Sequence, residues 1–276
     1  MNYLEYIQKN AHRIGVERQD PFTIEGIYGN KMERIRMIDN PYFQHQVDEL
    51  SGIPLTREFI TKVFNQNTYT GFVATMLWGG LGMSNWNQII KAMSIDKPEV
   101  ECKINNLQFL LGADKIHEAF MSLQSCRDKT YPQTNKFAGV DISYFTKLLY
   151  FLYNGDSSVS PIIFDKWSTY IHAGILFSLN EIELLNTFYK IGYNSKRQFY
   201  ISIKSNKTTG YRFSVYYDYL QRMANLSSQL NLPNPGLLEE YLFGKDLKHN
   251  KNKNDNNPRY FVSYYVKNSF NALSNQ

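Results

Sequence analysis

The sequence predicts a mainly α-helical protein, and three observations support this fold class. Apolar residues recur every three or four positions through most of the chain, which is the spacing of one helix face. The chain has no internal repeat and no alternation of strands and helices, so a parallel sheet is not expected. Strand-like alternation is confined to one short segment, RQFYISIKSN at residues 197–206. We therefore expect roughly ten helices.

The first half of the chain contains several helix signals after an uneven start. Residues 1–50 are expected to be polar and irregular, with proline at positions 21 and 41 interrupting any pattern. Two later segments each begin at a residue suited to cap a helix: Thr56 precedes one, and Asn85 precedes another. The helices expected in this half cover residues 55–67, 70–82, 85–94, 102–112 and 115–126.

The second half begins with an expected linker at residues 130–138 and continues as helices. The first of these includes the apolar run YFTKLLYFL, at residues 144–152, and stops at Asn154–Gly155. The segment 180–193 is amphipathic and is also expected to be a helix. The other helices expected here cover residues 161–175, 213–231 and 234–244.

We expect four segments along the chain. Residues 1–69 form an N-terminal polar and helical segment, and residues 70–245 form a helical core. Residues 246–259 are rich in Asn and Lys and are expected to be a flexible loop. Residues 260–276 form a C-terminal element.

Composition and motifs exclude several classes of protein. With 276 residues, 43% hydrophobic, the chain can bury a core as one large domain or two small ones. Only Cys102 and Cys126 are present, so we expect a reducing cytoplasm and not a disulfide framework. No signal peptide or membrane-spanning run is found. The chain lacks GxGxxG, P-loop and CxxC motifs, and its five histidines are scattered, so we expect no cofactor and no metal.

Lys147 is the most unusual residue of the sequence, because it lies inside the most apolar predicted helix. A helix that is apolar nearly all round should be buried. A lysine there must extend its amine to the surface, pair with an acid, or face a cavity. Desolvation disfavours the ammonium form, so a buried lysine can become an amine nucleophile near neutral pH. The simpler alternative is that Lys147 lies at the rim and only its stem is covered.

Asp165 follows Lys147 by 18 residues (165 − 147 = 18), across a loop, and precedes the next helix. Consecutive helices joined by a short loop usually lie antiparallel, so a Lys147–Asp165 pair is compatible with this spacing. The simpler interpretation of Asp165 is a helix cap.

These residues resemble a known family. Gly139-Val140-Asp141, the run YFTKLLYF and then IIFD, at residues 162–165, resemble the helix–hairpin–helix DNA glycosylases of the 8-oxoguanine type, within them the bacterial OGG-fold proteins. Trp78-Gly79 and LLEEYLF, at residues 237–243, resemble further motifs of that family. The resemblance covers roughly residues 70–245 and implies a helical glycosylase fold with a DNA-binding cleft.

The resemblance also implies roles for individual residues. The hairpin of Gly139, Val140 and Asp141 would bind a DNA phosphate through its backbone amides. Lys147 would attack C1′ of the target nucleotide, and Asp165 would assist. Such enzymes extrude the target base into a pocket. Four aromatic residues could line that pocket, although each is equally suited to an ordinary core: Trp78, Tyr144, Tyr150 and Trp167.

DNA is the partner that charge and resemblance together indicate. The net charge is +5, and the densest basic stretch runs from Lys196-Arg197 past Lys204 to Arg212, with tyrosines between and no acidic residue. Such a stretch suits contact with a phosphate backbone and stacking on bases. We expect a monomer that excises a modified base, in anti-phage defence for example. The alternatives are a catalytically inactive DNA-binding protein on the same scaffold, and an α-helical protein-interaction domain.

Overall fold

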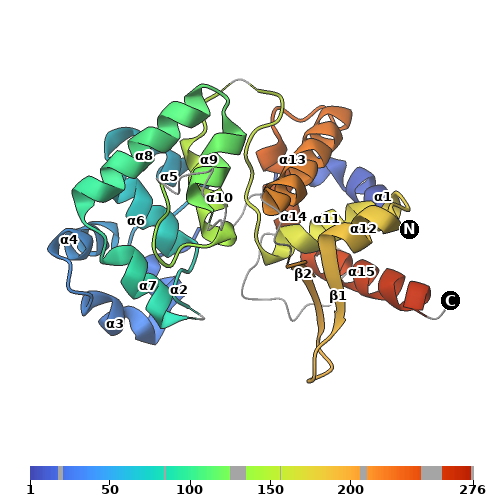
Figure 1. Cartoon of the computed structure of the whole chain (residues 1–276), viewed down its shortest axis with the longest axis horizontal. Helices are drawn as coiled ribbons and strands as arrows, with labels where there is room; N and C mark the ends of the chain where they lie inside the picture. Colours follow the sequence, from blue (N-terminus) through green and yellow to red (C-terminus); the bar gives the residue numbers. More distant parts are fainter. Residues whose placement is uncertain are drawn as a thin grey trace. The chain divides into compact units, whose positions relative to one another are not determined.

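The structure is a computed structural model, and it describes residues 1–17, 21–83, 85–124, 135–155, 157–205, 210–243 and 257–274. Helices dominate this part of the chain, and the sheet found in it has two strands, so the predicted fold class is confirmed (Figure 1). The chain divides into two compact units. Unit 1 comprises Met1–Gln19 and Ile162–Gln276, and unit 2 comprises Asp20–Pro161. The predicted core segment, residues 70–245, thus contributes to both units.

Unit 2 is built around α6 (Thr68–Trp78), in which every residue from Tyr69 onward is buried. Gly71 of α6 lets Phe64 approach so closely that an added Cβ would lie 2.4 Å from the phenylalanine ring. The surrounding helices are α2 (Ile24–Tyr28), α3 (Met32–Arg36), α4 (Pro41–Leu50), α5 (Arg57–Gln66), α7 (Trp86–Met93), α8 (Lys97–Gly112), α9 (Ile116–Leu123) and α10 (Ile142–Leu152).

Unit 1 is built around α11 (Lys166–Ser178), whose residues Ser168 to Phe177 are all buried. Gly174 brings other elements close to α11, because a Cβ there would lie 2.8 Å from the Tyr3 ring and 3.1 Å from Val262. The other elements are α1 (Tyr3–Lys9), α12 (Ile182–Phe188), β1 (Tyr189–Tyr193), β2 (Phe199–Ile203), α13 (Tyr211–Gln229), α14 (Pro235–Phe243) and α15 (Pro258–Ser274).

The local helix signals of the sequence are confirmed. The Thr56 hydroxyl accepts a hydrogen bond from the Phe59 amide at 3.0 Å, and so begins α5. The Asn85 side chain accepts from the Asn87 amide at 3.2 Å and begins α7. These caps satisfy amides that have no partner within their helix, so their effect is local and can be predicted without the fold.

The prediction of an irregular N-terminal segment is wrong. Asn2 and Glu5 form a reciprocal capping box that begins α1, and the tyrosines Tyr3 and Tyr6 are fully buried. Pro41 does not interrupt a helix but begins α4, at the position where its missing amide hydrogen costs no hydrogen bond. The helices of this segment are short and contain many polar residues, so their apolar pattern is weak in the sequence. Packing against the rest of the protein stabilises them.

The prediction of a helix over residues 180–193 is correct only as far as Phe188. Residues 189–193 form β1, which pairs antiparallel with β2, Ile191 opposite Ile201. The strand predicted within 197–206 is confirmed as β2, but its partner was missed. Because strand pairing joins segments apart in sequence, a helix-like period does not exclude it.

Two predicted segments lie wholly or mostly outside the described residues. They are the linker, of which only residues 135–138 are described, and the Asn/Lys-rich loop, described only from residue 257. No described helix is long and apolar enough to cross a membrane.

Candidate active site

Lys147 is buried in α10, with 5% of its surface exposed. Its Nζ donates a hydrogen bond to the Ser143 carbonyl one turn earlier, at 2.5 Å, and lies 5.2 Å from the centre of the Tyr144 ring. The amine thus stays close to its own helix and above an aromatic face. This excludes the alternative in which the lysine lies at the rim with an exposed amine.

The glycine turn after α6 forms the wall beside the lysine. A Cβ added to Gly79 would lie 3.1 Å from Cδ of Lys147, 3.3 Å from its Cε and 3.2 Å from the Tyr144 ring. The Tyr144 hydroxyl donates to the Gly80 carbonyl at 3.4 Å. The turn and Tyr144 therefore enclose the lysine stem between them, and Gly79 provides the space through which it passes.

A second tight turn leads into α10. Gly139 has φ +77°, and a Cβ on it would lie 2.5 Å from the Gln88 carbonyl oxygen. The Val140 amide donates to the Phe137 carbonyl at 3.2 Å, and the Asp141 side chain accepts from the Ile142 amide at 2.7 Å. Only glycine suits this position, on grounds of both backbone angle and space. Phosphate binding by this turn stays a prediction.

Asp165 lies in unit 1 and begins α11. Its Oδ1 accepts from the Trp167 amide at 2.8 Å and from the Ser168 amide at 3.2 Å, while its own amide donates to Ser168 Oγ at 3.2 Å. The interpretation of Asp165 as a helix cap is therefore confirmed. Its Oδ2 has no hydrogen-bond partner among the described residues. Lys147 belongs to unit 2, so neither unit alone contains both proposed catalytic groups.

Buried arginines cover three of the four aromatic residues proposed for the base pocket. The Arg57 guanidinium lies 5.7 Å from the Trp78 ring and 5.1 Å from the Tyr150 ring. In unit 1, the Arg259 guanidinium lies 5.0 Å from the Trp167 ring. Both arginines are at most 5% exposed. These arginine–aromatic contacts were not predicted from the sequence, because no local sequence pattern indicates that a cation will lie above a ring. The assignment of these rings to a base pocket stays a prediction.

The basic residues Lys196 and Arg197 lie in the exposed turn that joins β1 to β2, and Lys204 lies just beyond β2. The Lys204 amine donates to the Asn186 carbonyl, at the end of α12. The three predicted DNA-binding cations thus belong to one hairpin of unit 1. No group of three or more His, Cys, Asp or Glu that could hold a metal lies among the described residues.

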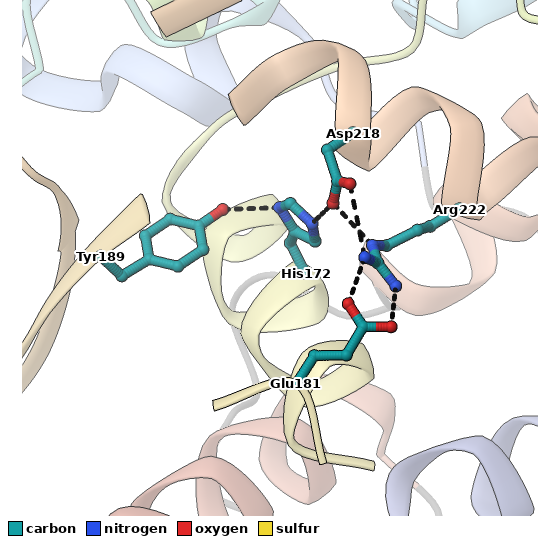
Figure 2. A network of polar contacts seen from close by, with 5 residues as sticks. All are labelled: His172, Glu181, Tyr189, Asp218 and Arg222. Carbon is teal, nitrogen blue, oxygen red and sulfur yellow. Dashed lines mark hydrogen bonds and ion pairs between the residues drawn. The ribbon is translucent and has the colours of Figure 1, made fainter. Parts of the chain in front are cut away.

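A buried polar network in unit 1 was not predicted from the sequence (Figure 2). His172 of α11 is fully buried, with Nδ1 2.8 Å from the Tyr189 hydroxyl and Nε2 2.6 Å from Asp218. Arg222 then bridges two acids: it lies 2.6 Å from Asp218 and 2.5 Å from Glu181. The network connects α11, α13, the start of α12 and the first residue of β1, so it fixes the base of the hairpin.

Stability should fall with acid because of His172. Burial lowers the pKa of His172 below the usual 6.5, against the opposing effect of Asp218. Below pH 6.5 the unfolded state therefore binds a proton that the folded state does not. As the pH is lowered, the free energy of unfolding decreases until the pH reaches the pKa of His172 in the folded state. Within that window the slope should approach about 1.4 kcal/mol per pH unit.

Urea unfolding between pH 5 and pH 8 measures this slope, and His172→Gln is the comparison. The variant should lose the part of the slope that His172 contributes. An unchanged slope in His172→Gln would contradict the assignment.

A protein-family model described as "Putative 8-oxoguanine DNA glycosylase OGG-like protein" matches residues 52–243 of the chain. The match covers more than half of the 276 residues and includes every residue proposed above for the site. Comparisons with curated proteins and with solved structures returned no match.

Proposed function

Since the chain belongs to the family described as "Putative 8-oxoguanine DNA glycosylase OGG-like protein", we propose that it removes a damaged or modified base from DNA by cleaving the N-glycosidic bond. One observation carries the proposal within that family. Lys147, for which the family resemblance implies the role of nucleophile, is a buried amine enclosed by Tyr144 and the glycine turn. A lysine so withdrawn from water is suited to covalent catalysis.

In the proposed reaction the target nucleotide leaves the duplex stack before any bond changes. The Lys147 amine, freed of one proton, attacks C1′ while the bond from C1′ to the base nitrogen breaks. The base leaves with the bonding electrons and takes up a proton. The carboxylate of Asp165 stabilises the positive charge that develops on the sugar. The resulting lysine adduct can form a Schiff base and allow strand cleavage, whereas water activated by Asp165 would release only the base.

The proposal is tested with duplexes that carry oxidised, alkylated or hypermodified bases. Base loss is read by alkaline cleavage at the abasic site. We expect cleavage with at least one of these substrates, and none when Asp165 or Lys147 is alanine. DNA binding without cleavage of any substrate would instead favour the inactive DNA-binding alternative.

Gly79→Ala should slow base excision without unfolding the protein. Gly79 has φ −69°, which alanine adopts freely, so the substitution adds only close contacts with the Lys147 stem, at 3.1 Å, and with the Tyr144 ring, at 3.2 Å. The lysine stem must shift, and a misplacement of about 1 Å costs roughly a hundredfold in rate, so we expect a loss of about tenfold for a smaller shift. Single-turnover excision on a cleaved substrate measures it.

Gly112→Ala is the matched control for this variant. It adds the same methyl group to unit 2, but its nearest neighbour would be Asn154 Oδ1 at 3.4 Å, an ordinary contact. Equal excision rates for the two variants would rule out a positioning role for Gly79.

One observation favours the inactive DNA-binding protein as a second candidate. Arg57 and Arg259 cover faces of Trp78, Tyr150 and Trp167 that a flipped base would need. On this alternative Lys147→Ala and Asp165→Ala leave DNA binding unchanged, and the wild type has no excision activity for them to remove.

We also propose a setting, defence of the cytoplasm against phage DNA with modified bases. Cells that express the wild-type chain, but not Lys147→Ala, should then show reduced plating of such phages.

A further inference from the structure

The β1–β2 hairpin has two chemically different faces. Its register places Tyr189 opposite Ile203, Ile191 opposite Ile201, and Tyr193 opposite Phe199, so one face is apolar. This face packs within unit 1: the Phe199 ring lies 6.2 Å from Tyr170 of α11 and 5.8 Å from Phe270 of α15. The apolar face of the hairpin thus packs against the helices of unit 1, and the opposite face points away from them.

The outward face carries a tyrosine laid over a glycine. It consists of Lys190, Gly192, Tyr200 and Ser202, with Tyr200 directly opposite Gly192. A Cβ on Gly192 would lie 4.0 Å from the Tyr200 hydroxyl, so the ring leans across the partner strand. Within the part of the chain that the structure describes, no other ring and no cation contacts Tyr200. Tyr200 is half-buried, and the open part of its ring is not stacked on another ring of the described residues. By contrast, Tyr193 of the apolar face, although 43% exposed, lies against the rings of Phe199 and Phe270.

The hairpin turn presents two cations next to this ring. The Asn194 side chain accepts from the amides of Lys196, at 3.0 Å, and Gln198, at 2.9 Å, which closes the turn. Arg197 takes the left-handed conformation, with φ +57°. Both cations are exposed, and in Figure 1 the turn extends beyond the helices of unit 1. The sequence has no Asp or Glu between residues 184 and 217, so no carboxylate on the hairpin opposes these charges.

We propose that this outward face binds an unpaired DNA strand, with one nucleobase stacked on Tyr200 and phosphates held by Lys190, Lys196 and Arg197. Stacking needs an exposed base face, which a duplex hides, so the ring selects unpaired DNA over duplex. The cations supply affinity that depends on salt and not on sequence. The proposal rests on the proposed function only in naming DNA as the polymer. It adds a contact that needs neither Lys147 nor Asp165.

The first test removes the ring. Binding of the full chain to a dT oligonucleotide, and to a duplex of equal length, is measured by fluorescence anisotropy. Tyr200→Leu should weaken binding of the oligonucleotide by about fivefold or more, because base stacking on an aromatic residue is worth that much. Duplex binding should change less than about twofold on the same grounds. Tyr200→Phe should restore the affinity, and Tyr42→Leu, an exposed tyrosine of unit 2, should not alter it.

The second test removes the charges. The double variant Lys196→Ala, Arg197→Ala should reduce the slope of log affinity against log salt by about 1.4, which is 0.7 for each single-strand phosphate contact. Lys62→Ala, Lys91→Ala removes the same charge from exposed positions of α5 and α7 and should leave the slope nearly unchanged.

Unchanged oligonucleotide binding in Tyr200→Leu, or equal losses for oligonucleotide and duplex, would overturn the proposal. These measurements detect binding alone, so they are independent of the excision assay. A chain that excises no base can still confirm the hairpin site, and an active enzyme can still refute it.

Discussion

Lys147→Met should abolish covalent trapping of the protein on substrate DNA by borohydride and lower excision roughly a hundredfold or more, as loss of a nucleophile usually does. Methionine keeps the length of the stem that packs against Gly79 and Tyr144, and it fits a side chain that is 5% exposed. What it removes is the amine. Because methionine has nearly the volume of lysine, the packing around position 147 is preserved, and the affinity for DNA should stay within about threefold of the wild-type value.

Lys103→Met is the matched control for this experiment. Lys103 also lies in unit 2 with a mostly covered side chain, where it pairs with Glu99 at 2.7 Å and lies 5.3 Å from the Phe137 ring. It should trap like the wild type. Undiminished trapping in Lys147→Met would place the nucleophile elsewhere. Base loss without any adduct in the wild type would favour water activated by Asp165.

His172→Ala should lower the free energy of unfolding by about 3–5 kcal/mol, the largest stability effect expected outside the apolar core. The imidazole is fully buried and its ring lies 5.7 Å from those of Tyr189 and Tyr219. Its removal leaves a cavity and takes a partner from both the Tyr189 hydroxyl and Asp218. Urea unfolding at pH 7 measures the loss.

Two further variants serve as comparisons for the stability loss expected in His172→Ala. Tyr189→Phe removes one hydrogen bond of the same network and should cost about 1–2 kcal/mol. His45→Ala removes an exposed histidine whose contact is with Glu49, one turn away, and should cost less than about 0.5 kcal/mol. If His172→Ala were no worse than His45→Ala, the network would not stabilise unit 1. Because Tyr189 begins β1, a weakened network should also weaken the DNA contact that we propose for the hairpin.

The helix signals that the sequence predicted correctly are those of short range. Thr56, Asn85 and Asp165 each cap a helix through an amide two or three residues away. The unusual position of Lys147 was likewise visible in the sequence, because a single lysine within an apolar helical pattern can be recognised without knowledge of the fold. The resemblance to the OGG-type glycosylases, drawn from these motifs, is confirmed by the family match over residues 52–243.

What failed depended on partners that are distant in sequence. Tyr189 pairs with Ile203 across the hairpin, and Tyr193 pairs with Phe199; this pairing turned a predicted helix end into a strand. The helix α1 at the N-terminus is buried because it packs against α11 and α15, which are distant in sequence. The local pattern of polar residues therefore led to the wrong prediction of an irregular segment.

The sequence by itself determined the helical class, the caps, the family and the candidate lysine, because each follows from residues within a turn or two of one another. Only the tertiary structure decided that Gly79 encloses Lys147, that Arg57 covers Trp78 and Tyr150, and that His172 joins Tyr189 to Asp218. These contacts join residues far apart along the chain. Their formation depends on how buried surfaces pack, and no local period contains that information.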